Sequence, residues 1–549
     1  MDGHDVAFGS TAEVERLASS RRLRVAASVL FVALLVLGVF FRVSALGRDL
    51  VWHDEIYTQV FASGHGSADW QARFYGGQIF HAGDVQQFVH DVPERSSWDT
   101  LSALARDEPQ HPPLYYLLAR SWRGVFGESI AALRALSVCA SVLGLALFYW
   151  LALELFRQRR VARMATVLMS VSPFFVLYAR EAREYALLGA WTIGASAALL
   201  HALRLLREQA PRSRVRAAWA LYVLLLTLGC YTSLSMAGVA LAHGLVVLAE
   251  AWRQPSGRRR SVLQYGVGAL AMSGLLFSPW LWALARHWES FRASMAWSSM
   301  IHISRPELLA HFGLSLSRPF VDLFSEPDSA SVVVAIGLFS LLLGLALASC
   351  WRAAQPHARS MLAALLLVPV AMFLLPDLLF GGIRSLSARY LTAGLLSLEL
   401  CVAFVLARRG RFRGARWTIA VLVIALGVGS VFVDRRREAT WNKGISRALP
   451  RVAAALEGHA DALLIASREQ HHPGNLLALS RLIDPNTAVL FAPFTPPMEI
   501  PDAPRPIYLF SVNPLLREFV EQRTGLHARR LVHDLYAELW LLEPAGSSD

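Results

Sequence analysis

Long apolar blocks recur along the whole chain, and they constrain its fold more than any other feature. Blocks of about 17–25 apolar residues have the length that a helix needs to cross a bilayer core of about 30 Å. The chain is 55% hydrophobic and only 17% charged, whereas soluble domains carry about 45–50% apolar and about 25% charged residues. This pattern excludes a soluble enzyme, a disordered scaffold and a nucleic-acid-binding domain, although the isoelectric point is about 10.

The blocks predict a mainly α, polytopic membrane protein with about eleven transmembrane helices. Residues 112–127 are apolar but short, and Arg120 and Arg123 interrupt them. We therefore expect a helix that lies at the membrane interface there. The predicted spans are residues 25–46, 129–156, 161–178, 185–205, 217–231, 234–251, 262–284, 331–350, 360–379, 390–407 and 416–433.

The arginines are distributed unevenly between the loops, and this sets the orientation. With the N-terminus inside, the inner segments together carry 24 arginines, whereas the short outer loops 179–184, 231–233 and 380–389 carry four. Positive charge accumulates in the cytoplasmic loops of membrane proteins. We therefore expect a cytoplasmic N-terminus.

Three large parts then lie on the outer side, namely the loops 47–128 and 285–330 and the C-terminal region 434–549. In the last region the apolar runs shorten to strand length, and helical stretches lie between them. The strand-like runs are 462–466, 488–492, 507–512 and 538–542, and the helical stretches lie near 446–457, 474–484 and 514–523. The chain therefore divides into a transmembrane domain, residues 1–433, and a small extracytoplasmic α/β domain, residues 434–549.

Charged residues at the outer membrane surface are candidates for function, because a charge at mid-bilayer costs about 2.5–3.5 kcal/mol even on the lenient scale. Asp54 and Glu55 follow the first span by a few residues. Adjacent carboxylates at that place suit a general base or a pair of metal ligands. For an isolated acidic pair, a solvated start of a loop is the more common explanation.

A second cluster, HPPLYY at residues 111–116, lies where the first outer loop returns to the membrane. The two prolines fix the start of the interfacial helix, and the tyrosines suit a membrane interface. Structural anchoring is the simpler role. Contact of His111 and Tyr115 with a phosphate or an acceptor is the functional alternative.

A third cluster, YAREAREY at residues 178–185, fills the short outer turn after Ser172-Pro173. In a helix, Arg180 would share one face with Arg183 and Glu184. Two neighbouring arginines repel each other unless an anion lies between them. Neutralisation by Glu181 or Glu184 explains the cluster equally well, so a binding role and a structural role both stay open.

A fourth cluster, Arg384, Arg389 and Tyr390, lies at the outer start of the tenth span. The planar fork of arginine suits phosphate, although a single arginine at a membrane edge commonly binds lipid headgroups. The chain has no GxGxxG, Walker or GxSxG motif. Nucleotide-driven and serine-hydrolase chemistry are therefore disfavoured.

Taken in order, these motifs resemble the bacterial GT-C glycosyltransferases of the protein-O-mannosyltransferase and aminoarabinose-transferase type. The resemblance covers about residues 25–433 and rests on the single N-terminal span, the Asp-Glu pair, HPPLYY, the arginine-rich turn after Ser-Pro, and the late Arg-Tyr. It implies a GT-C-like fold. It also implies a sugar donor carried on polyprenyl phosphate and used on the outer face of the bacterial plasma membrane.

The resemblance further implies roles for individual residues. Asp54 matches the catalytic acidic position of the family, with Glu55 as its partner, and Glu184 is the better placed match to a second acidic site. Arg389 matches the arginine near the donor phosphate. The candidate catalytic residues are thus Asp54, Glu55 and Glu184, and the candidate substrate-binding residues are His111, Tyr115, Arg180, Glu181, Arg183, Tyr185, Arg389 and Tyr390.

The expected reaction is an in-line, inverting transfer in which Asp54 takes the acceptor proton. Arg389, with Arg180 or Arg183, would hold the polyprenyl phosphate. The sequence names neither the sugar nor the acceptor, which is a glycan, a lipid or a protein. It assigns no cofactor and no metal ligands, and the need for a divalent cation stays open.

Two other classes of function remain as alternatives. A transporter or flippase of lipid-linked sugars would use the same arginine–phosphate contacts without a base. Transporters carry charges near mid-span and often inverted repeats, whereas the charges here gather at one face and no repeat is evident. A non-catalytic binding subunit is less favoured because the acidic positions are filled.

Overall fold

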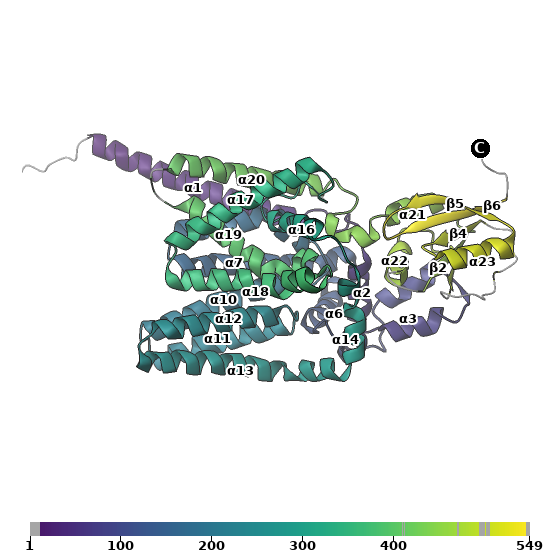
Figure 1. Cartoon of the computed structure of the whole chain (residues 1–549), viewed down its shortest axis with the longest axis horizontal. Coiled ribbons are helices and arrows are strands. Elements are labelled where there is room, and N and C mark those ends of the chain that lie inside the picture. The colour runs from purple at the N-terminus through teal and green to yellow at the C-terminus, as the bar shows by residue number, and fades with distance from the viewer. Residues whose placement is uncertain are drawn as a thin grey trace, which may run out of the picture.

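A bundle of long helices carries a small α/β domain at one of its ends, which we call the domain end (Figure 1). The computed structural model describes residues 11–324, 326–408, 410, 412–468, 472–492, 500 and 506–544. The long helices are α1 (Thr11–Val43), α7 (Ile130–Phe156), α8 (Arg159–Val171), α9 (Pro173–Ala179), α10 (Tyr185–Arg207), α11 (Arg212–Cys230), α12 (Met236–Arg253), α13 (Ser256–Arg286), α17 (Ala330–Ala353), α18 (Pro356–Phe380), α19 (Thr392–Ala407) and α20 (Arg413–Asp434).

Ten helices among the described residues are long and apolar enough to cross a membrane, and the pair α8 and α9 forms an eleventh candidate that is bent by 59°. This confirms the predicted fold class, and each predicted span corresponds to one of these candidates. The helix over residues 114–126 is not among them. The protein is therefore a multi-pass membrane protein.

The bend between α8 and α9 follows from Pro173, which has no N–H to continue the helix. Arg42, which is fully buried in α1, donates to the carbonyl oxygens of Ser170 at 2.6 Å and Met169 at 3.0 Å. These are among the last carbonyls of α8, and in an apolar bundle they need a partner. Arg42 therefore stabilises the bend, which aims α9 at the domain end.

Two long connections also gather at the domain end, and they contain most of the short helices. The first contains α2 (His53–Ala62), α3 (Ser67–Phe74), β1 (Ile79–His81), α4 (Ala82–Val85), η1 (Gln86–Val89), α5 (Ser97–Asp107) and α6 (Leu114–Phe126). The second contains α14 (Trp288–Met295), α15 (Trp297–Met300) and α16 (Arg305–Ser317), and two 3₁₀ turns, η2 (Arg384–Leu386) and η3 (Ala388–Leu391), precede α19.

The α/β domain is built on a six-stranded sheet of order β1-β3-β2-β4-β6-β5. The three central strands are parallel, and the outer strands join antiparallel. Four strands and three helices coincide with the predicted segments, whereas β1 and β5 were not predicted. The elements are η4 (Trp441–Ser446), α21 (Leu449–Leu456), β2 (Leu463–Ser467), α22 (His472–Leu479), β3 (Ala488–Ala492), β4 (Ile507–Phe510), α23 (Pro514–Thr524), β5 (His527–His533) and β6 (Glu538–Glu543).

Strand β1 comes from the first long connection, so the sheet is not made from the C-terminal region alone. Ile79 pairs with Leu490 in the antiparallel register of β1 and β3. Ile56 and Val60 of α2 pack into the same apolar core as Phe491. Helix α2 is therefore fixed between the sheet and the bundle, where it positions the candidate site.

Gly38 marks a close approach of α1 to α8, because an added Cβ would clash with the carbonyl oxygen of Ser170. We expect Gly38→Ala to destabilise the protein by about 1–3 kcal/mol, since neither backbone can yield without strain. Thermal unfolding of the purified protein in detergent measures this as a lower Tm. Gly344→Ala in α17 is the control, because a Cβ there meets nothing within 4 Å. Equal Tm values for the two variants would contradict the close approach.

Candidate active site

Asp54 lies in the first turn of α2 and is the centre of a charged cluster at the domain end. Its Oδ2 lies 3.2 Å from Nη1 of Arg389, and its Oδ1 lies 3.2 Å from Nδ1 of His53. Burial alone would raise its pKa, but Arg389, His53 and Arg183 hold the pKa well below its usual range. Asp54 is therefore a carboxylate at neutral pH, and 18% of its side chain stays exposed.

The start of helix α2 is stabilised in two ways, by acidic residues in its own first turn and by a hydrogen bond from its first residue to the C-terminal segment. Asp54 and Glu55 place negative charge in the first turn, which the helix dipole favours. The backbone N–H of His53 donates to Oγ of Ser446 at 3.1 Å, so a residue of the C-terminal segment satisfies one of the free N–H groups. The position of Asp54 thus depends on the α/β domain.

Arg389 lies between two aromatic rings. Its guanidinium carbon is 5.3 Å from the ring centre of Tyr185 and 5.5 Å from that of Tyr390. Tyr390 in turn stacks on Phe373. Within the part of the chain that the structure describes, Nε of Arg389 has no hydrogen-bond partner. The aromatic rings therefore orient the guanidinium, which keeps donor capacity for a further anion.

Residues 180–184 form a turn that is not helical, so Arg180 does not share a helical face with Arg183 and Glu184. Arg183 is buried, and its Nη1 donates to the hydroxyls of Tyr116 at 3.0 Å and Thr58 at 3.2 Å and to the backbone oxygen of Asp54 at 3.3 Å. These contacts join the turn to α2 and α6. Arg183 therefore fixes the site without needing a bound anion.

Glu184 is buried between two basic groups. Its Oε2 lies 3.3 Å from Nε of Arg183, and its Oε1 lies 3.4 Å from Nδ1 of His111. Burial alone would raise the pKa of Glu184, but Arg183 and His111 lower it to about 2. Glu184 is thus ionised and paired. His111 belongs to the same cluster and is partly exposed.

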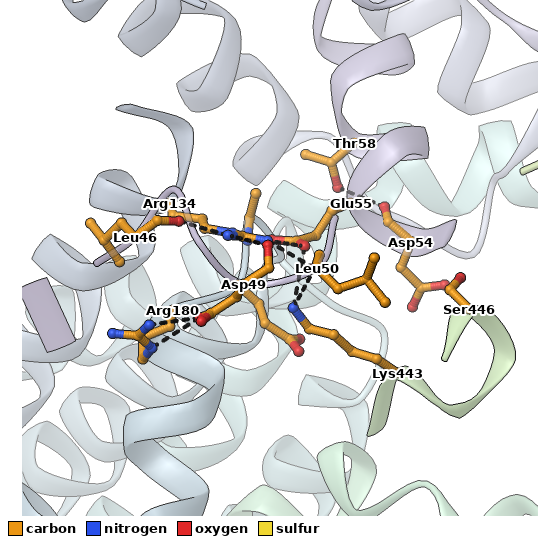
Figure 2. Close-up of polar contacts among 12 residues, drawn as sticks. Leu46, Asp49, Leu50, Asp54, Glu55, Thr58, Arg134, Arg180, Lys443 and Ser446 are labelled. Carbon is orange, nitrogen blue, oxygen red and sulfur yellow. Dashed lines mark hydrogen bonds and ion pairs between the residues drawn. The ribbon is translucent and has the colours of Figure 1, made fainter. Parts of the chain in front are cut away.

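Glu55 points away from Asp54, into an ion pair with Arg134 of α7 (Figure 2). Arg134 binds both carboxylate oxygens, from Nε at 2.7 Å and from Nη2 at 2.6 Å. The backbone N–H of Ala182 donates to Oε1 at 2.8 Å, and Nζ of Lys443 lies 3.6 Å from Oε2. Burial alone would raise the pKa of Glu55, but the two cations lower it to about 2. These contacts occupy both carboxylate oxygens of Glu55.

Arg180 points to Asp49 and not to Asp54 (Figure 2), and its assignment to the donor phosphate, as the alternative to Arg183, stays a prediction. Its Nη2 lies 2.7 Å from Oδ2 of Asp49. Its Nη1 donates to the backbone oxygens of Phe41, at 3.0 Å, and Ser44. Arg180 therefore closes the C-terminal end of α1.

Glu181 is buried beside Arg180, outside the Asp54 cluster. Its Oε1 accepts a hydrogen bond from Nδ2 of Asn442, whereas Oε2 has no hydrogen-bond partner among the described residues. Burial, with the nearby carboxylates of Glu55 and Asp54, raises the pKa of Glu181 to about 7, although Lys443 opposes this shift.

Tyr115 is not part of the cluster, because its hydroxyl lies 2.8 Å from Oγ of Ser137 inside the bundle. Tyr115 and Tyr116 are both buried, so the tyrosines of the HPPLYY segment do not form an interfacial belt. Arg384 pairs with Asp377 at 2.8 Å and not with Asp54. The predicted residues that the structure brings together are Asp54, His111, Arg183, Glu184, Tyr185, Arg389 and Tyr390.

Sequence reasoning missed the partners of three predicted residues: Arg134, which pairs with Glu55, Asn442, which bonds to Glu181, and Asp49, which pairs with Arg180. One signal for Arg134 was available, since it is a charge inside a predicted span, and such charges are costly unless paired. Asn442 and Asp49 lie in polar connections, where nothing in the local sequence pattern indicates that they contact predicted site residues.

Over the part of the chain that the structure describes, no group of three or more His, Cys, Asp or Glu side chains is arranged to hold a metal ion. The need for a divalent cation therefore stays a prediction without a site.

Comparison with known proteins supports the resemblance that the motifs indicated. A family model described as "Dolichyl-phosphate-mannose-protein mannosyltransferase" matches residues 110–282. The undecaprenyl phosphate-α-4-amino-4-deoxy-L-arabinose arabinosyl transferase of Erwinia tasmaniensis is 28% identical over 197 residues, which cover 36% of this chain. The match spans 34% of that relative, about a third of its length.

The fold is similar to solved structures of ArnT from Cupriavidus metallidurans. The structure bound to undecaprenyl phosphate aligns with a TM-score of 0.51 at 13% identity, covering 94% of this chain and 98% of that chain. The structure in the apo state aligns with a TM-score of 0.50 at 14% identity over the same shares. The chain has an ArnT-like GT-C fold, and the resemblance to GT-C glycosyltransferases is confirmed.

The Glu55–Arg134 pair makes a testable contribution to stability. Glu55→Gln leaves the guanidinium buried without its counter-charge, and we expect a loss of about 3–5 kcal/mol in the free energy of unfolding. Denaturant unfolding in detergent measures it. Glu326→Gln is the control, because Glu326 is exposed and pairs with Arg447 at the surface, where a pair is worth about 0–1 kcal/mol. Similar losses for both variants would rule out the special role of the buried pair.

The raised pKa of Glu181 predicts that the free energy of unfolding depends on pH. Because its pKa is raised to about 7 in the folded protein from 4.5, the folded state binds the proton more tightly, and stability falls as the pH rises from about 4.5 to about 7. Glu181→Gln removes this effect. We expect the variant to gain about 2–3 kcal/mol over the wild type between pH 5 and pH 8, at about 1.4 kcal/mol per pKa unit. Unfolding curves at both pH values test this, and a constant difference would refute it.

Proposed function

We propose that this protein is a membrane glycosyltransferase that moves a sugar from a polyprenyl-phosphate donor to an acceptor. One observation carries the proposal: a carboxylate, Asp54, lies 3.2 Å from Arg389, whose Nε has no hydrogen-bond partner among the described residues. Transfer from a phosphate carrier needs a base and a cation of this kind. The ArnT-like fold supports the proposal, because ArnT with that fold was solved with undecaprenyl phosphate bound.

We place the domain end on the outer face of the plasma membrane, with the N-terminus in the cytoplasm. Two facts support this orientation. Arginine-rich loops are favoured on the cytoplasmic side of a membrane, so the loops at the other ends of the same helices lie on the outer side. The connections that this rule assigns to the outer side all gather at the domain end of the bundle (Figure 1).

Arg389 is the residue proposed to hold the donor phosphate. Its guanidinium is oriented by Tyr185 and Tyr390, so little conformational freedom is lost when an anion binds. Negative charge grows on the phosphate oxygen as the bond to the anomeric carbon breaks, and a fixed cation stabilises that charge.

Asp54 is proposed to take the proton of the acceptor hydroxyl. In the structure its Oδ2 is occupied by Arg389. A donor phosphate that draws Arg389 to itself frees this oxygen for the acceptor, so the base becomes available when the donor is bound. The acceptor oxygen then bonds to the anomeric carbon, the phosphate leaves from the opposite face, and Asp54 receives the proton. Inversion at the anomeric carbon follows.

The other predicted acids are assigned to positioning. Glu55 and Glu184 are buried, ionised and paired with arginines, and both oxygens of Glu55 accept hydrogen bonds from Arg134. Arg183 fixes α2 through the backbone of Asp54. The acceptor (a glycan, a lipid or a protein) and the sugar are not specified by these contacts.

Transfer by protein reconstituted in liposomes tests the proposal, with labelled polyprenyl-phosphate sugars as donors and a membrane extract as acceptor. We expect Asp54→Asn to lower transfer at least a hundredfold while the donor still binds, because a positioned base contributes about 10²–10⁴-fold. Arg389→Gln should weaken donor binding as well as transfer.

Arg384→Gln is the matched control, since Arg384 lies in the same segment but pairs with Asp377; its transfer should stay within a few-fold of the wild type. Transfer that survives in Asp54→Asn would refute the assignment of the base. Movement of the donor across the bilayer with no transfer in any protein would instead identify a flippase.

A further inference from the structure

His53 lies beside the proposed base, Asp54, and has no role in the transfer described above. Its Nδ1 is 3.2 Å from Oδ1 of Asp54. Among the described residues, the Asp54 carboxylate has two side-chain hydrogen-bond partners, His53 at Oδ1 and Arg389 at Oδ2. The two oxygens of the base therefore have different partners, an imidazole and a guanidinium.

The contact with Asp54 sets the tautomer of the imidazole. An ionised carboxylate only accepts hydrogen bonds, so Nδ1 of His53 carries the proton that Oδ1 of Asp54 receives. The N–H of His53 thus holds one carboxylate oxygen, and the other oxygen points to Arg389. Together the two donors fix the plane of the carboxylate.

The bond from His53 matters most when the donor is bound. In the proposed reaction the donor phosphate draws Arg389 away from Oδ2 of Asp54. Within the described part of the chain, His53 is then the side-chain hydrogen-bond partner that the carboxylate keeps. A carboxylate without partners turns easily about its χ2 bond, and a base must stay within reach of the proton that it takes. His53 therefore keeps Oδ2 directed at the acceptor hydroxyl.

The ring of His53 is packed against the C-terminal segment. Helix α22 lies next to α2 (Figure 1), and its Gly474 is buried. A Cβ added at residue 474 would clash with Cδ2 of His53, and it would lie 2.7 Å from Nε2 of His53 and 2.8 Å from Cε2 of Tyr57. The ring of Tyr57 meets the imidazole edge to face, with centres 4.9 Å apart. Gly474 and Tyr57 thus leave the imidazole little room to turn away from Asp54.

The backbone of His53 is held by the same part of the chain. Its N–H donates to Oγ of Ser446, and that hydroxyl donates to Oδ1 of Asn475 at 2.7 Å. Nδ2 of Asn475 donates to the backbone oxygen of Ile445 at 2.9 Å. Asn475 follows Gly474 directly, so the first turns of α22 fix both the ring and the backbone of His53.

The close approach explains why residue 474 is a glycine. Its φ lies outside the left-handed region, so the backbone there accepts an L side chain. Glycine inside a helix costs about 0.5–1 kcal/mol relative to alanine. The imidazole of His53 occupies the space that a methyl group would need, and alanine at this position would displace it.

We propose that His53 is a positioning residue for Asp54 and that Gly474 holds it in place, so that the α/β domain sets the direction of the base. The proposal rests on the proposed function, because it gives His53 a task in that transfer. His53 acts through Asp54 and needs no contact with the donor or the acceptor.

Two substitutions of the same shape at His53 test the positioning role. The amide nitrogen of asparagine lies as many bonds from Cα as Nδ1 of histidine does, so His53→Asn keeps a donor for Oδ1 of Asp54, whereas His53→Leu has none. We measure kcat and the donor KM in liposomes, with the labelled polyprenyl-phosphate sugar that the wild type transfers. Because a positioned base contributes about 10²–10⁴-fold, we expect kcat to fall at least about tenfold in His53→Leu and to stay within about threefold in His53→Asn.

The donor KM should be unchanged in both variants, because Tyr185 and Tyr390 orient Arg389 independently of His53. A residue that only fills space would lower kcat equally in the two variants, and equal kcat values would refute the positioning role.

A double-mutant cycle tests the part of Gly474. Gly474→Ala should lower kcat at least about tenfold, as loss of the imidazole does, and it should cost nothing further in His53→Ala, where no ring stands in the way of the methyl group. Gly444→Ala in η4 is the matched control, because a Cβ there would first meet Cε2 of Tyr536, at 4.0 Å; its kcat should equal that of the wild type. The same loss from Gly474→Ala in both backgrounds would break the link to His53.

Asp54→Asn in the same assay separates this proposal from the proposed function. A wild-type kcat in Asp54→Asn would overturn the assignment of the base itself. A wild-type kcat in His53→Leu, with kcat lost in Asp54→Asn, would overturn the positioning role alone.

Discussion

The buried ion pair between Glu55 and Arg134 is the interaction on which the candidate site depends. It joins α2 to α7, and the N–H of Ala182 and the ammonium of Lys443 complete it from two further segments. Removing two charges from water costs several kcal/mol per ion, which good geometry and added hydrogen bonds must offset. The fork of Arg134 and the N–H of Ala182 meet that condition. The result is a rigid junction beside Asp54, at the level where the membrane domain meets the α/β domain.

Two adjacent acids have opposite roles because they lie on a helix. Successive residues of an α-helix are about 100° apart around its axis. Glu55 therefore points to Arg134 of the bundle (Figure 2), while Asp54 pairs with Arg389 and keeps some exposure. A similar separation holds in the turn before α10, where Glu184 joins the site and Glu181 bonds to Asn442 instead. In each pair, backbone geometry assigns one carboxylate to a structural contact and leaves the other near the proposed chemistry.

Hydropathy and turn residues were enough to predict the spans, the bent eighth and ninth helices as one block, and four strands of the sheet, because burial in lipid or in a core imposes local patterns. The partners of the charged residues were not predictable in this way. Arg180 pairs with Asp49 and Arg134 with Glu55 because distant segments meet, and no periodicity encodes such meetings. Strand β5 was missed because it is largely exposed and carries arginines, and β1 because three residues are too short for a pattern.

The pairing of β1 with β3 also bears on how the protein is made. Ile79 leaves the ribosome about 400 residues before its partner Leu490, and every membrane span after the first is synthesised in between. The first long connection must therefore wait, with its strand edge and the apolar side chains of α2 and α3 uncovered, until the last segment has been synthesised. Such distant contacts slow folding and expose the chain to misassembly. Completion of the site is thus tied to the last part of synthesis, and a chain released early would carry Asp54 on a helix that the C-terminal segment does not yet hold.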